Sequence, residues 1–293
     1  MTISDEDYQR AVAQKQEQHS RAVAAERPLR ALTLYDWQAE SFDLARCPEI
    51  LARSVELARM TPNKLSVKFE KNGRVRVSNI RKPADVLDKL KALQAYLWVA
   101  LDDAIDGNFS NLNSQAAFTQ KPNYRRIQVA NVVKLFDIDQ CVEIIRLFSA
   151  TVALGYGFTH VAPQSIATFF SAGVVVVGDP DQLRGNRATV LREGLGFGDH
   201  RLGLVHDIYE LNVLAPVHME RRIGGKSLRE WIGAGERGRL IDVSANNSVW
   251  LVPDALQASI RNEFAFAELL FPPRRAELID PRIPVAGDKS VMN

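Results

Sequence analysis

The 293-residue sequence has little of what marks secreted, membrane-spanning or redox proteins. Its only cysteines, Cys47 and Cys141, are far apart, so they offer neither a disulfide framework nor a Cys-x-x-Cys pair. No stretch approaches the ~20 continuous apolar residues that a membrane-spanning helix needs. The acidic, polar start MTISDEDYQR lacks the basic and then apolar build of a secretory signal. We therefore expect a soluble protein of the reducing cytoplasm.

The chain also lacks a strong charge of either sign. Its 37 Lys and Arg residues against 35 Asp and Glu residues leave a formal charge of +2. This balance does not by itself argue for a nucleic-acid or a membrane partner. Nucleic-acid binding by the basic hairpin at 64–79 is also disfavoured, because Phe69 should point inward and leaves no aromatic side chain there to stack on bases. The 46% hydrophobic and 25% charged residues are ordinary for a globular protein, and the length suits two domains or one large domain.

The pattern of apolar residues predicts both strands and helices, without the regular strand–helix–strand spacing of a parallel sheet. We expect an α+β fold, with an antiparallel or mixed sheet that has helices on one face, preceded by a smaller hairpin-and-helix domain. Changes in composition divide the chain into a polar helical arm, a domain of helices plus a basic β-hairpin, an α+β domain and an irregular tail. These four regions are residues 1–26, 27–122, 123–272 and 273–293.

Local signals place the individual elements. Each helix is expected to begin at a proline in its first turn or at a polar side chain that caps its free N–H groups. Strands are expected where apolar residues alternate with polar ones or run together. The predicted helices cover 48–61, 83–106, 137–155, 227–232 and 254–270, the strands 64–79 (as a hairpin), 125–136, 238–243 and 248–252, and the best linker candidate is 108–123.

Residues 64–79 carry the clearest local signal, a β-hairpin with one apolar face. A three-residue loop at 71–73 places Val67 opposite Val77, which gathers the valines on one side. The other side then presents a patch of positive charge, which implies an acidic partner if this face binds a protein. The patch consists of Lys64, Lys68, Lys71, Arg74 and Arg76.

Two groups of side chains could hold a metal ion. The acids of LDDAIDG, near the end of the predicted helix 83–106, have a spacing able to bind Mg²⁺ for diphosphate chemistry. Three histidines between residues 199 and 220 could bind zinc. The acids lack the second metal motif of isoprenoid diphosphate enzymes and the histidine spacings match no standard pattern, so polar helix-end and surface positions are favoured. The candidate ligands are Asp102, Asp103 and Asp106, or His200, His206 and His218.

Two further motifs resemble nucleotide or cofactor loops. VVVVGDPDQLRG (174–185) brings Asp179 and Asp181 to a strand end, but no Gly-rich loop with a lysine is placed to hold phosphates. VLREGLGFGD (190–199) spaces its glycines as S-adenosylmethionine methyltransferases do, but no buried strand precedes it. A strand-end turn and a flexible surface loop are the simpler interpretations, and we expect no cofactor.

The order of features from residue 125 to 270 resembles that of immunity proteins, which protect bacteria from toxins of type VI secretion systems. The resemblance is carried by GYGFTH (155–160), DIYELNVLAPVHMERRIGG (207–225), LREWI (228–232) and the apolar strand around Trp250. It implies an α+β protein without catalytic machinery that covers the active site of a toxin.

The ionisable residues form no coherent catalytic set, so we predict a non-enzymatic protein that binds and masks a protein partner with its 125–270 region. A cognate toxin is the partner that the resemblance implies. The competing hypothesis is an enzyme that uses either of the two metal-ligand groups above. Aromatic side chains often anchor interfaces, although such residues are more often part of a core. The candidate anchors are Tyr209, Trp231 and Trp250.

Overall fold

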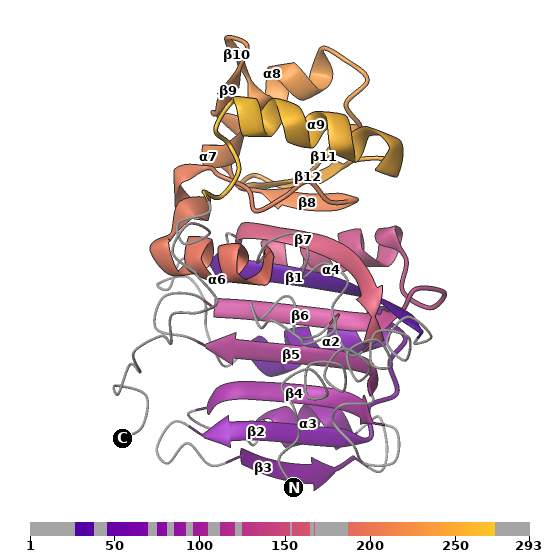
Figure 1. The fold of residues 1–293 in the computed structure, drawn as a ribbon. Coiled ribbons are helices and arrows are strands. Elements are labelled where there is room, and N and C mark those ends of the chain that lie inside the picture. Colours follow the sequence, from indigo (N-terminus) through magenta and orange to yellow (C-terminus); the bar gives the residue numbers. More distant parts are fainter. Residues whose placement is uncertain are drawn as a thin grey trace, which may run out of the picture.

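The fold is built on one long antiparallel sheet. The computed structural model describes residues 27–37, 46–69, 75–80, 85–91, 96–104, 112–120, 125–152, 154–164, 167 and 187–272. Ten of the described strands form the sheet in the order β11-β12-β8-β7-β1-β6-β5-β4-β2-β3, and all their pairings are antiparallel (Figure 1). This confirms the expected α+β class with an antiparallel sheet. The strands are β1 (Pro28–Trp37), β2 (Lys64–Phe69), β3 (Val75–Asn79), β4 (Tyr96–Ala104), β5 (Leu112–Gln120), β6 (Arg125–Val132), β7 (Leu154–Pro163), β8 (Leu211–Leu214), β11 (Arg239–Ser244) and β12 (Asn247–Leu251).

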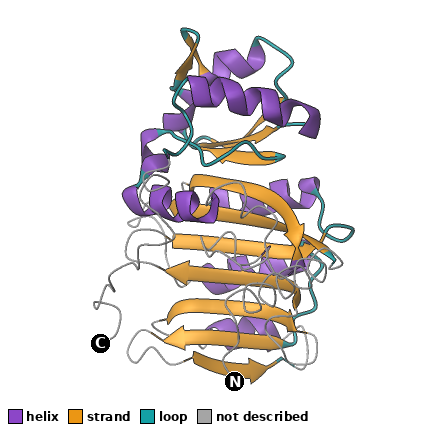
Figure 2. Ribbon diagram, in the orientation of Figure 1, coloured by secondary structure: helices purple, strands orange, loops and turns teal. Residues whose placement is uncertain are grey.

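Helices lie on both faces of this sheet, whereas the sequence predicted them on one face (Figure 2). One face is covered by α2 (Cys47–Leu57), α3 (Asp85–Lys91) and α4 (Ile138–Ser149). The C-terminal elements pack against the opposite face of the strands near β8: α6 (Arg187–Phe197), the 3-10 helix η4 (Asp199–Leu202), α7 (Pro216–Met219), α8 (Leu228–Gly233) and α9 (Asp254–Phe266). The small separate hairpin of β9 (Arg222–Ile223) and β10 (Lys226–Ser227) joins α7 to α8.

Two hydrophobic cores follow from the alternation of side chains along each strand. On β1, Leu34 belongs to the core under α2 and α4, while its neighbour Tyr35 belongs to the core under the C-terminal helices. On β12, Val249 and Trp250 divide in the same way. Successive side chains of a strand point to opposite faces, so a sheet covered on both sides buries consecutive residues.

The sheet continues across residue 122, where the sequence predicted a domain boundary. β1 lies between β6 and β7 and pairs with both. Leu29 lies opposite Val132 of β6, and Pro28 lies opposite Pro163 of β7. β5 pairs with β6 directly. The described strands of the two predicted domains therefore share one sheet, and the predicted arm at 1–26 and tail from 273 lie outside the described residues.

The two helices that the sequence predicted from capping residues, α4 and α8, begin where it placed them. The side chain of Asp137 accepts a hydrogen bond from the Gln140 backbone at the start of α4, and Ser227 and Glu230 form the same capping box at α8. The helix at Pro48, the strands β11 and β12, and the final helix also lie where the sequence predicted them.

The segment 83–120 was predicted wrongly. The expected long helix consists of the short α3 followed by strand β4, and the expected linker contains strand β5. Val99, Ala100, Leu101 and Asp102 are all buried, because both faces of β4 are covered. A strand buried on both faces reads as a continuous apolar run, which local periodicity does not distinguish from a buried helix.

The β2–β3 hairpin is present, but its register differs from the prediction. Val67 lies opposite Arg76, and Ser66 lies opposite Val77. Residues directly opposite each other point to the same face, so Arg76 lies on the face of Val67 while Lys64 and Lys68 lie on the other face. The described cations of the expected patch are thus divided between two faces, and Val77 remains 45% exposed.

Candidate functional site

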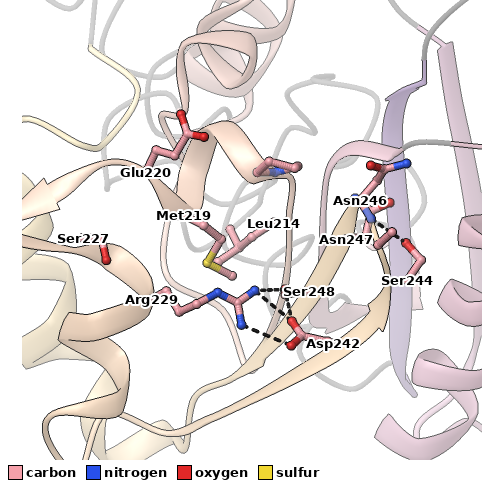
Figure 3. Close-up of a pocket in the computed structure, with 12 residues that line it drawn as sticks. Leu214, Met219, Glu220, Ser227, Arg229, Asp242, Ser244, Asn246, Asn247 and Ser248 are labelled. Carbon is pink, nitrogen blue, oxygen red and sulfur yellow. Dashed lines mark hydrogen bonds and ion pairs between the residues drawn. The ribbon is translucent and has the colours of Figure 1, made fainter.

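A hollow of about 610 Å³ lies between α7, the start of α8 and the turn that joins β11 to β12 (Figure 3). Its lining combines apolar side chains from β8 and α7 with polar side chains from the turn and from α8. The full lining is Leu214, Pro216, Met219, Glu220, Ser227, Arg229, Asp242, Ser244, Ala245, Asn246, Asn247 and Ser248.

An ion pair lies within the hollow. Arg229 of α8 donates from Nη1 to Oδ2 of Asp242 at 3.1 Å and from Nη2 to Oδ1 at 2.9 Å, a two-pronged contact with β11 (Figure 3). Ser248 of β12 completes the group, because it accepts from Nη2 of Arg229 at 3.0 Å and donates to Oδ1 of Asp242 at 2.6 Å. Such fork-shaped contacts fix the geometry of both partners.

The electrostatics of this group keep both partners charged. The hydrogen bond with Asp242 raises the pKa of Arg229. The hydrogen bond with Arg229, and then that with Ser248, lowers the pKa of Asp242. The side chain of Arg229 is 49% exposed and that of Asp242 61%, so the pair adds little to stability.

Buried hydrogen bonds hold the β11–β12 turn against the body of the sheet. The side-chain amide of Asn247 accepts from the backbone N–H of Leu154 at 3.1 Å and donates to the carbonyl of Leu154 at 2.8 Å. Asn247 therefore occupies the place of a paired strand residue at the start of β7. The rim that carries Ser244 and Asn246 is fixed in position by this contact.

The predicted carboxylate cluster does not form on a helix end. Asp102 and Asp103 are neighbours on strand β4, so their side chains point to opposite faces of the sheet. They therefore cannot coordinate the same metal ion. Asp102 is buried, where it accepts a hydrogen bond from Gln115 at 2.8 Å. Asp106 lies outside the described residues.

The three histidines are buried rather than exposed on the surface. Nδ1 of His206 lies 2.7 Å from the hydroxyl of Tyr209, and Nδ1 of His218 accepts from the backbone N–H of Ala215 at 3.2 Å. Burial, followed by the influence of His200, lowers the pKa of His218 to about 4. Across the described parts of the chain, no three His, Cys, Asp or Glu side chains are placed to hold a metal ion.

The three candidate anchors are core residues. Trp250 is fully buried and packs against Trp231 and Phe264, with ring centroids 6.3 and 5.6 Å away. Tyr209 stacks on Phe158 at 4.3 Å. With their rings turned inward, these residues organise the core beneath α8 and α9 and present no aromatic surface to a partner.

The loop-like motifs have different outcomes. VLREGLGFGD forms most of helix α6, which ends at Phe197 just before Gly198, so it is not the expected flexible loop. Asp179 and Asp181 lie outside the described residues, as do Lys71 and Arg74 of the expected basic patch.

Sequence reasoning missed Arg229 and Asp242. They are thirteen residues apart, and the contact depends on how α8 packs over β11. The available signal was the capping box at Ser227, which fixes the start of α8 and therefore the direction in which Arg229 leaves it.

Comparison with known proteins identifies a similar fold. No protein-family model and no curated protein sequence matches this chain. A solved structure described as "Pseudomonas aeruginosa T6SS protein PA0821" is similar over 83% of this chain and 73% of that chain, with a TM-score of 0.53 and 10% sequence identity. That degree of likeness shows a shared fold. Within the described ranges, no helix has the length and apolar character needed to cross a membrane.

Proposed function

We propose that this chain is an immunity protein, which binds a toxin of a type VI secretion system and neutralises it by covering the toxin's active site. The observation that carries this proposal is the likeness in fold to a T6SS protein over most of both chains. The cytoplasmic location and the non-enzymatic mode of action expected from the sequence are parts of the same proposal.

The placement of the resembling segments supports it. GYGFTH (155–160) lies in β7, DIYELNVLAPVHMERRIGG (207–225) includes β8, α7 and β9, and LREWI (228–232) forms most of α8. Among these elements, β8, α7 and α8 contribute lining residues to the hollow, and β7 pairs with β8, so the resemblance and the candidate site fall on the same part of the fold.

The chemistry of the hollow also suits binding. Arg229, Asp242 and Ser248 hydrogen-bond to one another, and the apolar Leu214 and Met219 also line the hollow. Protein interfaces commonly combine polar and apolar side chains, as this lining does. The site therefore supports recognition of a partner surface.

Purification of the tagged full chain from the bacterium that encodes it, followed by a toxicity assay of its partner, tests this proposal. We expect one stoichiometric protein partner that stops growth when expressed alone in a host cell. Co-expression of this chain should restore growth, because the complex occludes the toxin. A chain that purifies without a partner, or a partner that is harmless alone, would contradict the proposal.

A further inference from the structure

Two exposed apolar side chains lie near the junction of α6 and η4, and neither lines the hollow. The side chain of Phe197, the last residue of α6, is 67% exposed, and that of Leu202, the last residue of η4, is 57% exposed. Arg201 beside them is also exposed. We call Phe197, Arg201 and Leu202 the knob. Large exposed apolar side chains gathered in a few residues often mark a site of protein contact.

The knob is held by a rigid support. Asp199 and His200, between its members, are buried, and glycines with left-handed backbones, Gly198 and Gly203, end η4 on both sides. The N–H of Arg201 donates to the carbonyl of Gly198 at 2.9 Å. Since its backbone is already fixed, the knob loses little further freedom on binding, which favours affinity.

The charge around the knob indicates the chemistry of its partner. Arg192 and Arg201 are exposed, while Glu193 is only half-exposed and Asp199 is buried. The exposed ionisable side chains of residues 190–204 are therefore both arginines. Electrostatic complementarity requires an acidic rim on the surface that receives the knob, around an apolar floor for the two exposed apolar side chains.

The knob and the hollow are continuous through α7. Gly203 at the end of η4 lies so close to α7 that a Cβ atom there would be 2.6 Å from the carbonyl oxygen of Val217. Pro216 and Met219 of the same helix line the hollow. Figure 1 shows α6, α7 and the β9–β10 hairpin along one side of the molecule, on the left. A single partner can therefore cover both features.

From these observations we propose that the knob inserts into an acid-rimmed apolar cleft of the protein partner. Phe197 and Leu202 fill the cleft, and Arg201 pairs with its carboxylates. The identification of that partner as a toxin rests on the proposed function, whereas the chemistry of the contact does not. A knob-to-knob contact between two copies is disfavoured, because a symmetric contact uses the same patch twice and sets arginines against arginines.

Site-specific cross-linking tests the proposal. The photoreactive phenylalanine analogue p-benzoylphenylalanine replaces Phe197 in the full chain, and cells of the encoding bacterium are irradiated. We expect a cross-link to a different protein, which mass spectrometry identifies. The purified partner is then titrated with variants of the chain by calorimetry.

In that titration, Arg201→Glu should weaken the dissociation constant by at least ~30-fold and Leu202→Ser by ~10-fold. The controls are Arg53→Glu on α2, at the opposite face of the sheet, and Leu135→Ser between β6 and α4, where Leu135 is 47% exposed. Both should change it less than about twofold. Melting temperatures of all variants verify folding.

Three results would overturn the proposal: no cross-link, a cross-link within this chain or to a second copy of it, or an Arg201→Glu variant that binds as well as Arg53→Glu. A harmless partner that binds through Arg201 would refute the immunity function and leave the knob established. The two claims therefore fail separately.

Discussion

At the scale of single residues, burial decides which ionisable side chains are available for chemistry. Asp102, His200 and His218 carry groups that could serve catalysis, but each is enclosed in the fold. Arg229 and Asp242 are exposed and satisfy each other. Among the described side chains of the hollow, Arg229 and Asp242 are therefore accessible to another molecule.

The buried Asp102 gives a prediction on pH dependence. Burial raises the pKa of this carboxyl to about 6, so the folded state binds the proton more tightly than the unfolded state. Its contribution makes the free energy of unfolding rise as the pH falls from 7 through 6 towards 4. Asp102→Asn should remove this contribution. The change that the substitution makes in the free energy of unfolding should therefore be more favourable at pH 7 than at pH 4.5, by about 2 kcal/mol.

Urea unfolding of both proteins at pH 7 and 4.5 measures this difference. The wild type is the control for all other titrating groups, since they are common to both proteins. An equal effect of the substitution at the two pH values would show that the Asp102 carboxyl is not perturbed as described.

The residue scale also marks the limit of prediction from sequence. Trp231 and Trp250 were candidate anchors because aromatic residues dominate interface energetics, yet both are enclosed by α9, which lies far from Trp231 in the sequence. For Arg229 and Asp242, the only local signal was the capping box that starts α8, and it does not reveal their contact across thirteen residues. Neither the burial of an aromatic ring nor a contact between a helix and a strand is encoded in the neighbouring residues.

At the scale of elements, prediction succeeded where the signal is local. The capping boxes at Asp137 and Ser227 satisfy free N–H groups within the same four residues, so they are visible in the sequence. β4 and β5 were missed because their stability comes from neighbouring strands on both sides. The hairpin was recognised, but its register is also set by pairing with β4.

Two glycines of the α6–η4 junction test the element scale. Gly203 has φ +77° and no space for a Cβ atom beside Val217, so Gly203→Ala should destabilise the fold by about 3 kcal/mol. Gly196 lies in α6 with open space around it, so Gly196→Ala should stabilise the fold by about 0.5 kcal/mol. Urea unfolding followed by tryptophan fluorescence measures both, and similar effects at the two positions would contradict the described junction.

At the scale of the whole molecule, one sheet with a core on each face presents the hollow and the knob on the same side of the C-terminal elements. The fold class could be predicted from the sequence, because the local pattern shows strands and helices without the spacing of a parallel sheet. The unity of the sheet could not, since β1 pairs with strands about a hundred residues away.

A contact competition between the parent bacterium and a strain that lacks this chain measures the central claim most directly. If the chain neutralises a toxin delivered by neighbouring cells, survivors of the deletion strain should fall by at least ~100-fold on solid medium beside the parent. Inactivation of the parent's secretion apparatus, or return of the gene to the deletion strain, should restore them. Equal survival of the deletion strain and the parent would contradict the account.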